Sequence, residues 1–270
     1  MPRINDLFPS VGTARLDHLR FFRISGADAV TFLQGQLSND VAALDPGEVQ
    51  LTSFNSPKGR VLAIGRLARI GDDYLLGIDA GIAEAAAKRL AMFILRSKVT
   101  LAPEESISGL VGFGDVDLPA TDGCARFELP GPDGASTRTE VFGPADELSM
   151  VDCDIDADRL AELDILCKLP RITPDNQDQH VAQHLDLEHL GAINFKKGCY
   201  TGQEVIARMH YLGRKKTRVL VLLQSGAAES GEDSKLKVVN TAGKLRLAIE
   251  PKASEKTVFE IDGETCETLS

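Results

Sequence analysis

The fold of this chain is constrained most by a succession of short apolar runs, each of strand length, that turn-forming residues separate. Before residue 115 these runs span 20–24, 49–54, 61–70, 74–78, 98–101 and 107–113. Clusters of Gly, Pro, Asn and Asp at 55–59 and 71–73 stand between neighbouring runs. Such clusters between apolar runs are typical of β-hairpins, so the first part of the chain is predicted to form antiparallel strands.

Three helices are predicted beside these strands. The first covers 27–34, with a cap formed by Ser25 followed by Asp28 and an end at Gly35. The second covers 82–95, which is rich in Ala and Leu, and the third covers 156–166. Strands with few intervening helices predict an α+β fold, in which helices cover one face of an antiparallel sheet.

The chain changes character twice along its length. Pro and Gly are frequent over 115–138, which predicts a surface loop or hinge. Beyond residue 218 short apolar runs return, at 219–223, 236–239, 245–249 and 258–261. They predict a small all-β domain, barrel-like in form, over 214–270, with a loop at 224–234. Residues 1–213 are then expected to form the main region, from two interleaved α+β subdomains.

Composition narrows the range of partners and compartments. The chain has 270 residues, 43% of them hydrophobic, and a formal net charge of -10. Such a polyanion repels phosphate surfaces, which argues against general nucleic-acid or membrane binding. The five cysteines form no Cys-x-x-Cys pair, so they favour a reducing compartment and no resident cluster or structural zinc. No stretch approaches the roughly 20 apolar residues of a membrane span. We expect a cytoplasmic monomer.

The densest group of reactive side chains lies in the run Lys-Lys-Gly-Cys-Tyr-Thr-Gly-Gln-Glu at 196–204. Its glycines allow close backbone approach to a ligand, and neighbouring ammonium groups would stabilise a thiolate at Cys199. Gln203 offers a donor and an acceptor, and Glu204 can accept from ring N–H groups. The alternative interpretation, from the residues alone, is a glycine-rich turn around a buried structural cysteine.

Two histidines four residues apart, His180 and His184, have the spacing of metal ligands on a helix. The glutamate that follows the first histidine in zinc proteases is absent, since Val181 occupies that position. Surface histidines near a helix cap are the favoured interpretation, and no metal site is predicted.

The run Lys-Gly-Cys-Tyr-Thr-Gly-Gln-Glu at 197–204 resembles the signature of the YgfZ family, which shares the T-protein fold and includes a mitochondrial relative in iron-sulfur assembly. The segments around it, 191–195 and 205–208, are similar too. So are three earlier segments, at 32–41, 58–62 and 97–101. The chain has no tryptophan, so any stacking on a pterin would come from Phe, Tyr or aliphatic side chains.

This resemblance implies a ring of domains around a central cavity that binds tetrahydrofolate or a derivative. Cys199 would be the residue needed for activity. The residues implied to bind the folate are those of the signature and the segment that follows it: Lys197, Gly198, Tyr200, Gly202, Gln203, Glu204 and Arg208. The implied role is a folate-binding accessory protein that supports iron-sulfur assembly or repair and, through it, tRNA modification, with iron-sulfur assembly proteins or client enzymes as partners.

A basic cluster surrounds the signature and includes Lys196, Lys197, Arg208, Arg214, Lys215, Lys216 and Arg218. It is expected to neutralise the carboxylate tail of folate or an anionic partner, since Arg offers a planar fork to carboxylates. The alternative is a solvated face at the start of the last domain.

Two other functions remain open at this stage. The first is a folate-dependent aminomethyltransferase, although no acidic pair follows the turn at 58–60 to manage the proton transfer. The second is a thiol redox protein, although no resolving cysteine lies near Cys199 in sequence.

Overall fold

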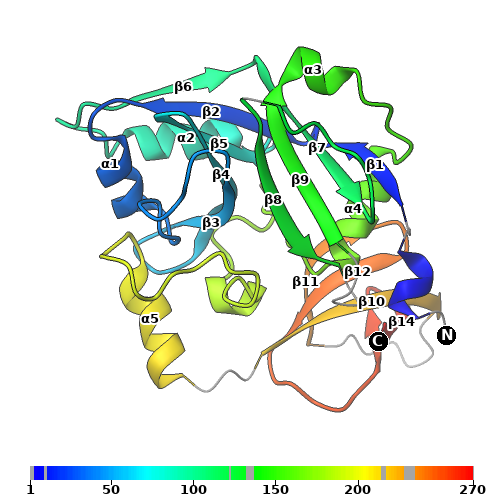
Figure 1. The fold of residues 1–270 in the computed structure, drawn as a ribbon. Coiled ribbons are helices and arrows are strands. Elements are labelled where there is room, and N and C mark those ends of the chain that lie inside the picture. Colours follow the sequence, from blue (N-terminus) through cyan, green and yellow to red (C-terminus); the bar gives the residue numbers. More distant parts are fainter. Residues whose placement is uncertain are drawn as a thin grey trace.

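The computed structural model describes residues 3–8, 11–121, 123–131, 137–213, 217–227 and 235–269. Within these residues the strands form three antiparallel sheets, with helices packed beside them (Figure 1). The α+β class predicted from the sequence is therefore confirmed.

The first sheet has five strands in the order β3-β4-β5-β2-β6. These are β2 (Leu19–Ser25), β3 (Val49–Asn55), β4 (Val61–Ile70), β5 (Asp73–Asp79) and β6 (Thr100–Glu104). The predicted strands up to 78 are confirmed to within two residues, and a tight turn joins β4 to β5 as expected. The central strands are buried on both faces because helices cover one side and neighbouring elements the other.

Two helices belong to this first sheet, and both differ from the prediction at their ends. Helix α1 (Ala29–Gln36) continues through Gly35, where a Cβ would meet nothing within 4 Å. Helix α2 (Ala83–Ala91) stops four residues earlier than predicted. The chain then makes an exposed turn in which Leu95 has a φ of 40°, a left-handed conformation that cannot continue an α-helix.

The second sheet has the order β1-β7-β9-β8, from β1 (Gly12–Arg15), β7 (Ile107–Phe113), β8 (Ala125–Pro130) and β9 (Thr137–Pro144). The predicted loop over 115–138 is therefore wrong for β8 and for the start of β9. β8 is an edge strand in which exposed Arg126 and Glu128 alternate with buried Ala125 and Leu129, and this short alternation is easily hidden among prolines and glycines.

Three further α-helices and two short 3₁₀ helices accompany these two sheets. Helix α3 (Ala145–Ser149) follows β9 directly. The predicted helix over 156–166 is observed as α4 (Ala157–Leu166), where the Asp156 carboxylate accepts from the backbone N–H of Arg159 at 2.8 Å. The 3₁₀ helices are η1 (Ile4–Leu7) and η2 (Ala182–Leu185), and helix α5 (Gln203–Leu212) follows η2.

The third sheet contains the last five strands in the order β11-β12-β10-β14-β13. They are β10 (Arg218–Ala227), β11 (Lys237–Ala242), β12 (Leu245–Glu250), β13 (Val258–Ile261) and β14 (Glu264–Thr268). The edge strands β11 and β13 do not pair, so within the described residues this sheet is open and the expected barrel is not closed. The predicted boundary at 213/214 falls beside residues 214–216, outside the described residues, and the two-domain division stays a prediction.

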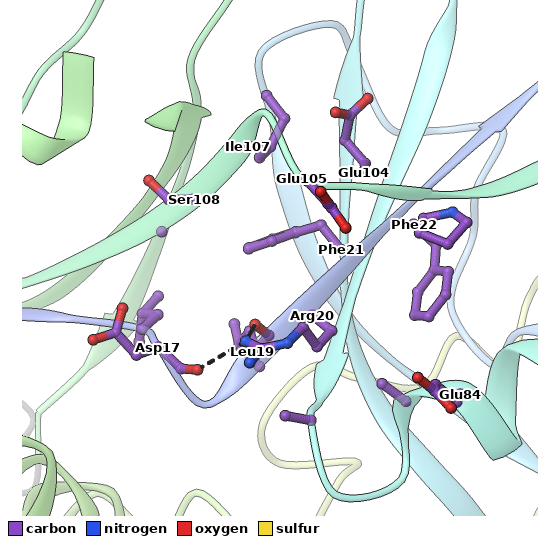
Figure 2. A pocket seen from close by; sticks show the side chains of 15 residues that line it. Asp17, Leu19, Arg20, Phe21, Phe22, Glu84, Glu104, Glu105, Ile107 and Ser108 are labelled. Atoms are coloured by element: carbon purple, nitrogen blue, oxygen red, sulfur yellow. Dashed lines mark hydrogen bonds between the residues drawn. The ribbon is translucent and has the colours of Figure 1, made fainter. Parts of the chain in front are cut away.

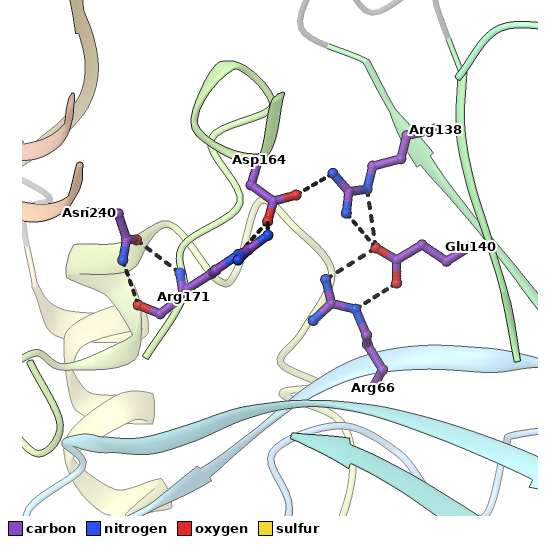
Figure 3. A network of polar contacts seen from close by, with 6 residues as sticks. All are labelled: Arg66, Arg138, Glu140, Asp164, Arg171 and Asn240. Atoms are coloured by element: carbon purple, nitrogen blue, oxygen red, sulfur yellow. Dashed lines mark hydrogen bonds and ion pairs between the residues drawn. The ribbon is translucent and has the colours of Figure 1, made fainter. Parts of the chain in front are cut away.

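A buried charge network joins the three sheets where they meet (Figure 3). Its members are Arg66 of β4, Arg138 and Glu140 of β9, Asp164 of α4, Arg171, and Asn240 of β11. Glu140 accepts from both Arg66 and Arg138, and Asp164 accepts from both Arg138 and Arg171. Charges this deep are stable only when paired, so the network fixes the relative position of the sheets.

In the part of the chain that the structure describes, no helix is both long enough and apolar enough to cross a membrane.

Candidate functional site

The loop that carries Cys199 is held against the end of α1 by hydrogen bonds between segments far apart in sequence. The Ser38 hydroxyl donates to the carbonyl of Ala192 at 2.6 Å, and the N–H of Asn194 donates to the carbonyl of Ser38 at 3.0 Å. The backbone N–H of Thr201 donates to the carbonyl of Gly35 at 3.2 Å. Two segments that resemble the family separately, 32–41 and 191–204, therefore form one structure.

The side chain of Lys197 makes two charge-assisted hydrogen bonds between the loop and the end of α1. Its side chain is 8% exposed, and its Nζ donates to the carbonyl oxygens of Leu37 and Asn39, at 2.7 Å each. Burial lowers the pKa of Lys197 to about 8, although the nearby Asp40 carboxylate opposes this change. The Nζ also lies 5.2 Å from the centre of the Tyr200 ring. The Lys197 ammonium is thus directed at the 37–39 segment, where it shapes the loop.

The turn between β3 and β4 packs against the start of α5. Gly202 caps α5 with a φ of 84°, and a Cβ there would lie 2.6 Å from the carbonyl oxygen of Ser56. Gly59, with a φ of 70°, approaches Val205 in the same way: a Cβ there would lie 2.8 Å from the Val205 Cβ. Only glycine fits both positions, because the left-handed conformation and the close approach each exclude a larger residue.

Cys199 and Gly198 lie at the exposed end of this loop. A Cβ at Gly198 would meet nothing within 4 Å. Tyr200 by contrast is buried, its hydroxyl has no hydrogen-bond partner, and burial raises its pKa to about 12. The loop thus presents one thiol to solvent from a backbone that its buried neighbours hold in place.

Helix α5 separates two environments. Glu204 and Arg208 form an exposed ion pair of 2.7 Å on one side. Ile206, the buried residue of the helix, lies about 160° away around the axis, on the side of Met209 and His210. The predicted ligands Glu204 and Arg208 therefore pair with each other at the surface, while Gln203 is the first residue of the helix.

A cavity of about 950 Å³ lies on the Met209 side of α5. Its lining comes from the segment after α4, from η2 and the turn after it, from the end of α5 and from the start of the third sheet: Lys168, Gln183, His184, Asp186, Glu188, His189, Met209, His210, Gly213, Thr217 and Pro251. A smaller hollow of about 150 Å³ shares Lys168, Asp186 and His189 with it and is otherwise mostly apolar, with Leu129, Leu166 and Leu190 in its wall.

The shared wall of the two hollows has unusual backbone and side-chain features. Lys168 and Asp186 both adopt a positive φ, 53° and 57°, although neither is glycine. Gln183 donates to the carbonyl of Ile206 at 2.6 Å, but its own carbonyl oxygen is buried with no partner. Burial and the charge of Lys237 lower the pKa of His184, which favours its neutral form. Strained backbone and an unpaired buried acceptor are features that collect at ligand sites.

The loop and the cavity meet at an aromatic stack. The Phe195 ring of the loop lies 3.8 Å from the ring of His210, nearly parallel at 15°. His210 in turn lies 2.9 Å from a carboxylate oxygen of Glu188, and both line the cavity. Cys199 itself is not among the residues that line either hollow, nor are the other predicted ligands in the described chain.

Of the two histidines with metal-ligand spacing, His184 lines the cavity and His180 does not. Five lining residues come from the stretch 183–189, and the fold brings Lys168, Met209 and His210 beside it. No group of three potential metal-binding side chains occurs among the described residues. Arg214, Lys215 and Lys216 of the predicted basic cluster lie outside the residues that the structure describes.

Another pocket, of about 540 Å³, lies between β2, β7 and the start of α2 (Figure 2). Its floor includes Phe21, Leu19 and Ile107, and its rim carries Glu84 and Glu105. It shares no residue with the loop or the cavity, and none of the predicted site residues lines it.

The fold is similar to that of an aminomethyltransferase of known structure. The glycine cleavage system aminomethyltransferase T from Bartonella henselae matches 99% of this chain and 87% of its own chain, with a TM-score of 0.68 and 16% sequence identity. The architecture is therefore T-protein-like.

The sequence comparisons identify the family, although no family model matches the chain. The tRNA-modifying protein YgfZ of Escherichia coli O157:H7 is 32% identical over 250 residues, which cover 83% of this chain and 76% of the relative. The protein of the same name from Shigella boydii serotype 18 is 31% identical over the same share of each chain. This chain belongs to the YgfZ family.

Proposed function

We propose that this chain is a cytoplasmic folate-binding accessory protein that supports iron-sulfur cluster assembly or repair and, through it, tRNA modification. The curated relatives are named for tRNA modification, and the T-protein-like fold is shared with an aminomethyltransferase. The observation that carries the folate part is the cavity beside α5, which shares Lys168, Asp186 and His189 with a smaller, mostly apolar hollow. We further propose a monomer divided into regions 1–213 and 214–270.

The cavity residues fit tetrahydrofolate, which carries one-carbon units when it is bound. The apolar hollow between Leu129 and Leu190 would accept the flat pterin ring. The Asp186 carboxylate and the unpaired carbonyl oxygen of Gln183 would accept hydrogen bonds from ring N–H groups. Lys168, in the shared wall, would attract the carboxylates of the tail.

We assign a separate task to the loop. Cys199 is the exposed nucleophile or transient ligand that faces a partner, while Lys197, Gly202 and Tyr200 maintain the backbone that presents it. The Phe195 and His210 stack would connect the loop to the wall of the ligand cavity. The alternative is that folate binds at the loop itself, through the residues that the sequence predicts as ligands, among them Gly198, Gln203, Glu204 and Arg208.

Calorimetry with tetrahydrofolate and with folinic acid tests the ligand and separates the two candidate sets of residues. Lys168→Ala should weaken binding about tenfold or more, because a charge-assisted hydrogen bond contributes about 1.5–3 kcal/mol. Arg208→Ala should change the affinity less than twofold, since its side chain is 65% exposed and paired with Glu204. The reverse pattern would move the ligand to the loop, and no binding by the intact wild-type protein would refute the folate role.

The thiol role is tested in cells that lack their own member of the family. Cys199→Ala should leave the folding and the folate affinity unchanged but fail to restore the activity of iron-sulfur enzymes, whereas Cys153→Ala should restore it. Full rescue by Cys199→Ala would contradict the assignment. Turnover of an aminomethyl donor by the purified protein would instead select the transferase function.

A further inference from the structure

The turn after α2 is an exposed patch that combines apolar and basic side chains. Met92, Phe93 and Leu95 are 71%, 37% and 89% exposed. Four cations flank them in the described surface, all exposed: Lys88, Arg89, Arg96 and Lys98. No Asp or Glu occurs from 85 to 103, although the whole chain has a net charge of -10. Large apolar side chains grouped at the surface indicate an interaction site.

The backbone of this turn is held in an unfavourable conformation. Leu95 has a φ of 40°, which costs free energy for a residue with a Cβ, yet its side chain gains nothing from burial. The Asp28 carboxylate accepts from the N–H of Lys98 at 2.7 Å, and the N–H of Asp28 donates to the Lys98 carbonyl at 3.3 Å. The start of α1 thus supports the turn that presents Leu95.

Helix α1 connects this turn to the loop of Cys199. Its first residues adjoin Asp28, and at its other end Gly35 accepts from the N–H of Thr201. The helix has eight residues, so the two contacts lie about 12 Å apart along a rigid element. In Figure 1 the start of β6 lies above α1, and α5 lies below it, along the same side of the molecule.

Helix α1, which lies between the two ends, has no charged side chain of its own, and Asp28 stands at its N-cap. α1 has the sequence Ala-Val-Thr-Phe-Leu-Gln-Gly-Gln, and its exposed positions include Val30, 38% exposed, and Thr31. The charges lie at the ends: the cations of the turn at one, and Lys196 with the Glu204–Arg208 pair at the other. Protein interfaces have this arrangement, with few charges in the centre and a polar rim.

We infer that Met92, Phe93 and Leu95, the exposed face of α1 and the Cys199 loop form one docking surface for a partner protein. The contact face of that partner has apolar side chains surrounded by carboxylates, which complement the four cations. Docking on the turn brings a reactive group of the partner to the thiol at the other end of α1. A standard interface of about 800 Å² per partner is wide enough to cover both ends. The inference rests on the proposed function only for the role of Cys199.

The shape and composition of the turn favour a protein over a lipid surface or an RNA. A shallow, open depression lined by Asp28, Phe93, Leu95, Arg96 and Ser97 lies on the patch, so a protruding apolar side chain of a partner can rest against Phe93 and Leu95. A bilayer offers no such projection, and its anionic surface repels the acidic remainder of the chain. The phosphates of an RNA would pair with the four cations, but RNA offers no apolar surface against which Leu95 and Met92 could be buried.

Site-specific photocrosslinking in cells tests this surface. A benzoylphenylalanine placed at Leu95 and, separately, at Thr31 should crosslink to the same protein, identified by mass spectrometry. The same residue at Met150, which is 83% exposed on another element, is the matched control and should not. Arg89→Glu with Arg96→Glu should abolish both crosslinks, since reversing two rim charges opposes association with an acidic face.

The purified partner then gives the quantitative result. Leu95→Asp should raise the Kd at least tenfold and leave the affinity for tetrahydrofolate unchanged, while Met150→Asp should change neither. Cys199→Ala should dock normally, so a failure of the thiol role is distinguishable from a failure of docking. Different crosslinked proteins at positions 95 and 31, no crosslink, or an unchanged Kd would overturn the inference. So would flotation with phosphatidylglycerol vesicles that Leu95→Asp abolishes.

Discussion

Asp164→Asn removes one charge from the network that joins the three sheets, and it is the sharpest test of how the fold is held together. The Asp164 carboxylate is 1% exposed and lies 2.5 Å from both Arg138 and Arg171. Arg138 is 0% exposed and would keep only Glu140 as a charged partner. Three buried or partly buried cations would then face one carboxylate.

The expected cost follows from that imbalance. Removing one partner of a buried ion pair typically destabilises a protein by about 3–5 kcal/mol, because the remaining charge stays buried without compensation. For a chain somewhat above 250 residues, each kcal/mol lowers the melting temperature by about 2–4 °C. Asp164→Asn should therefore lower the melting temperature by about 10 °C.

The dependence on pH gives an independent check of the same charge. Burial alone raises the pKa of Asp164, but Arg138 and Arg171 outweigh it and lower the pKa to about 2, from 3.8 in the unfolded chain. The resulting stabilisation, roughly 2 kcal/mol, is present above pH 4 and is lost as the pH falls from about 4 to 2. Burial likewise raises the pKa of Glu140, but the guanidinium groups of Arg66 and Arg138 outweigh it and lower that pKa to about 2.

Urea denaturation between pH 2 and pH 7 measures both effects. The free energy of unfolding of the wild type should fall steeply below pH 4. Asp164→Asn should unfold with a smaller free energy at neutral pH, and this free energy should fall less steeply with decreasing pH. Glu128→Gln is the matched control, because Glu128 and Arg126 form an exposed pair of 3.6 Å that contributes about 0–1 kcal/mol. If the free energy of unfolding of Asp164→Asn stays within about 1 kcal/mol of the wild type and falls with pH as the wild type does, the buried charge does not hold the sheets together.

Two further substitutions test the loop. Gly202→Ala should destabilise the protein by about 1–3 kcal/mol, because a Cβ at a φ of 84° would clash with Ser56. Gly198→Ala is the control and should be nearly neutral in the same urea titration, since the space around Gly198 is open. Equal losses of stability in the two variants would contradict the packing of Gly202 against Ser56. Tyr200→Phe should leave the stability unchanged or raise it by up to about 1 kcal/mol, since it removes a buried hydroxyl without a partner. A loss above 1 kcal/mol in thermal unfolding would show that this hydroxyl is satisfied in solution.

The fold could be predicted where local signals agree with burial. The turn between β4 and β5 and the strands beside it follow from apolar runs around Gly71 and Asp72. Helix α5 was missed because Ile206 is its only fully buried residue, which leaves almost no apolar periodicity. β14 was missed for a similar reason, since Cys266 is its only buried side chain. The end of α2 was misplaced because exposed Met92 and Phe93 look like core residues in sequence.

Part of the candidate site could be predicted from local sequence, and part depends on the fold. The loop of Cys199 could be predicted because its reactive side chains and glycines lie next to one another in the single run 196–204. The cavity depends on Lys168, Gln183, His189 and His210, which come from three separate segments of the chain and share no motif. The role of Lys197 was also hidden, since only the fold shows that its ammonium binds the 37–39 carbonyls.

The connection between Lys197 and the end of α1 spans about 160 positions of the chain, and this distance has a consequence for biosynthesis. Contacts of such long range form late, because a large loop must close before they yield any gain. A nascent or partly folded copy therefore lacks the ordered loop around Cys199. Only the finished molecule presents this thiol in a fixed position beside helix α1, so a partner that reads that position can distinguish mature copies from immature ones.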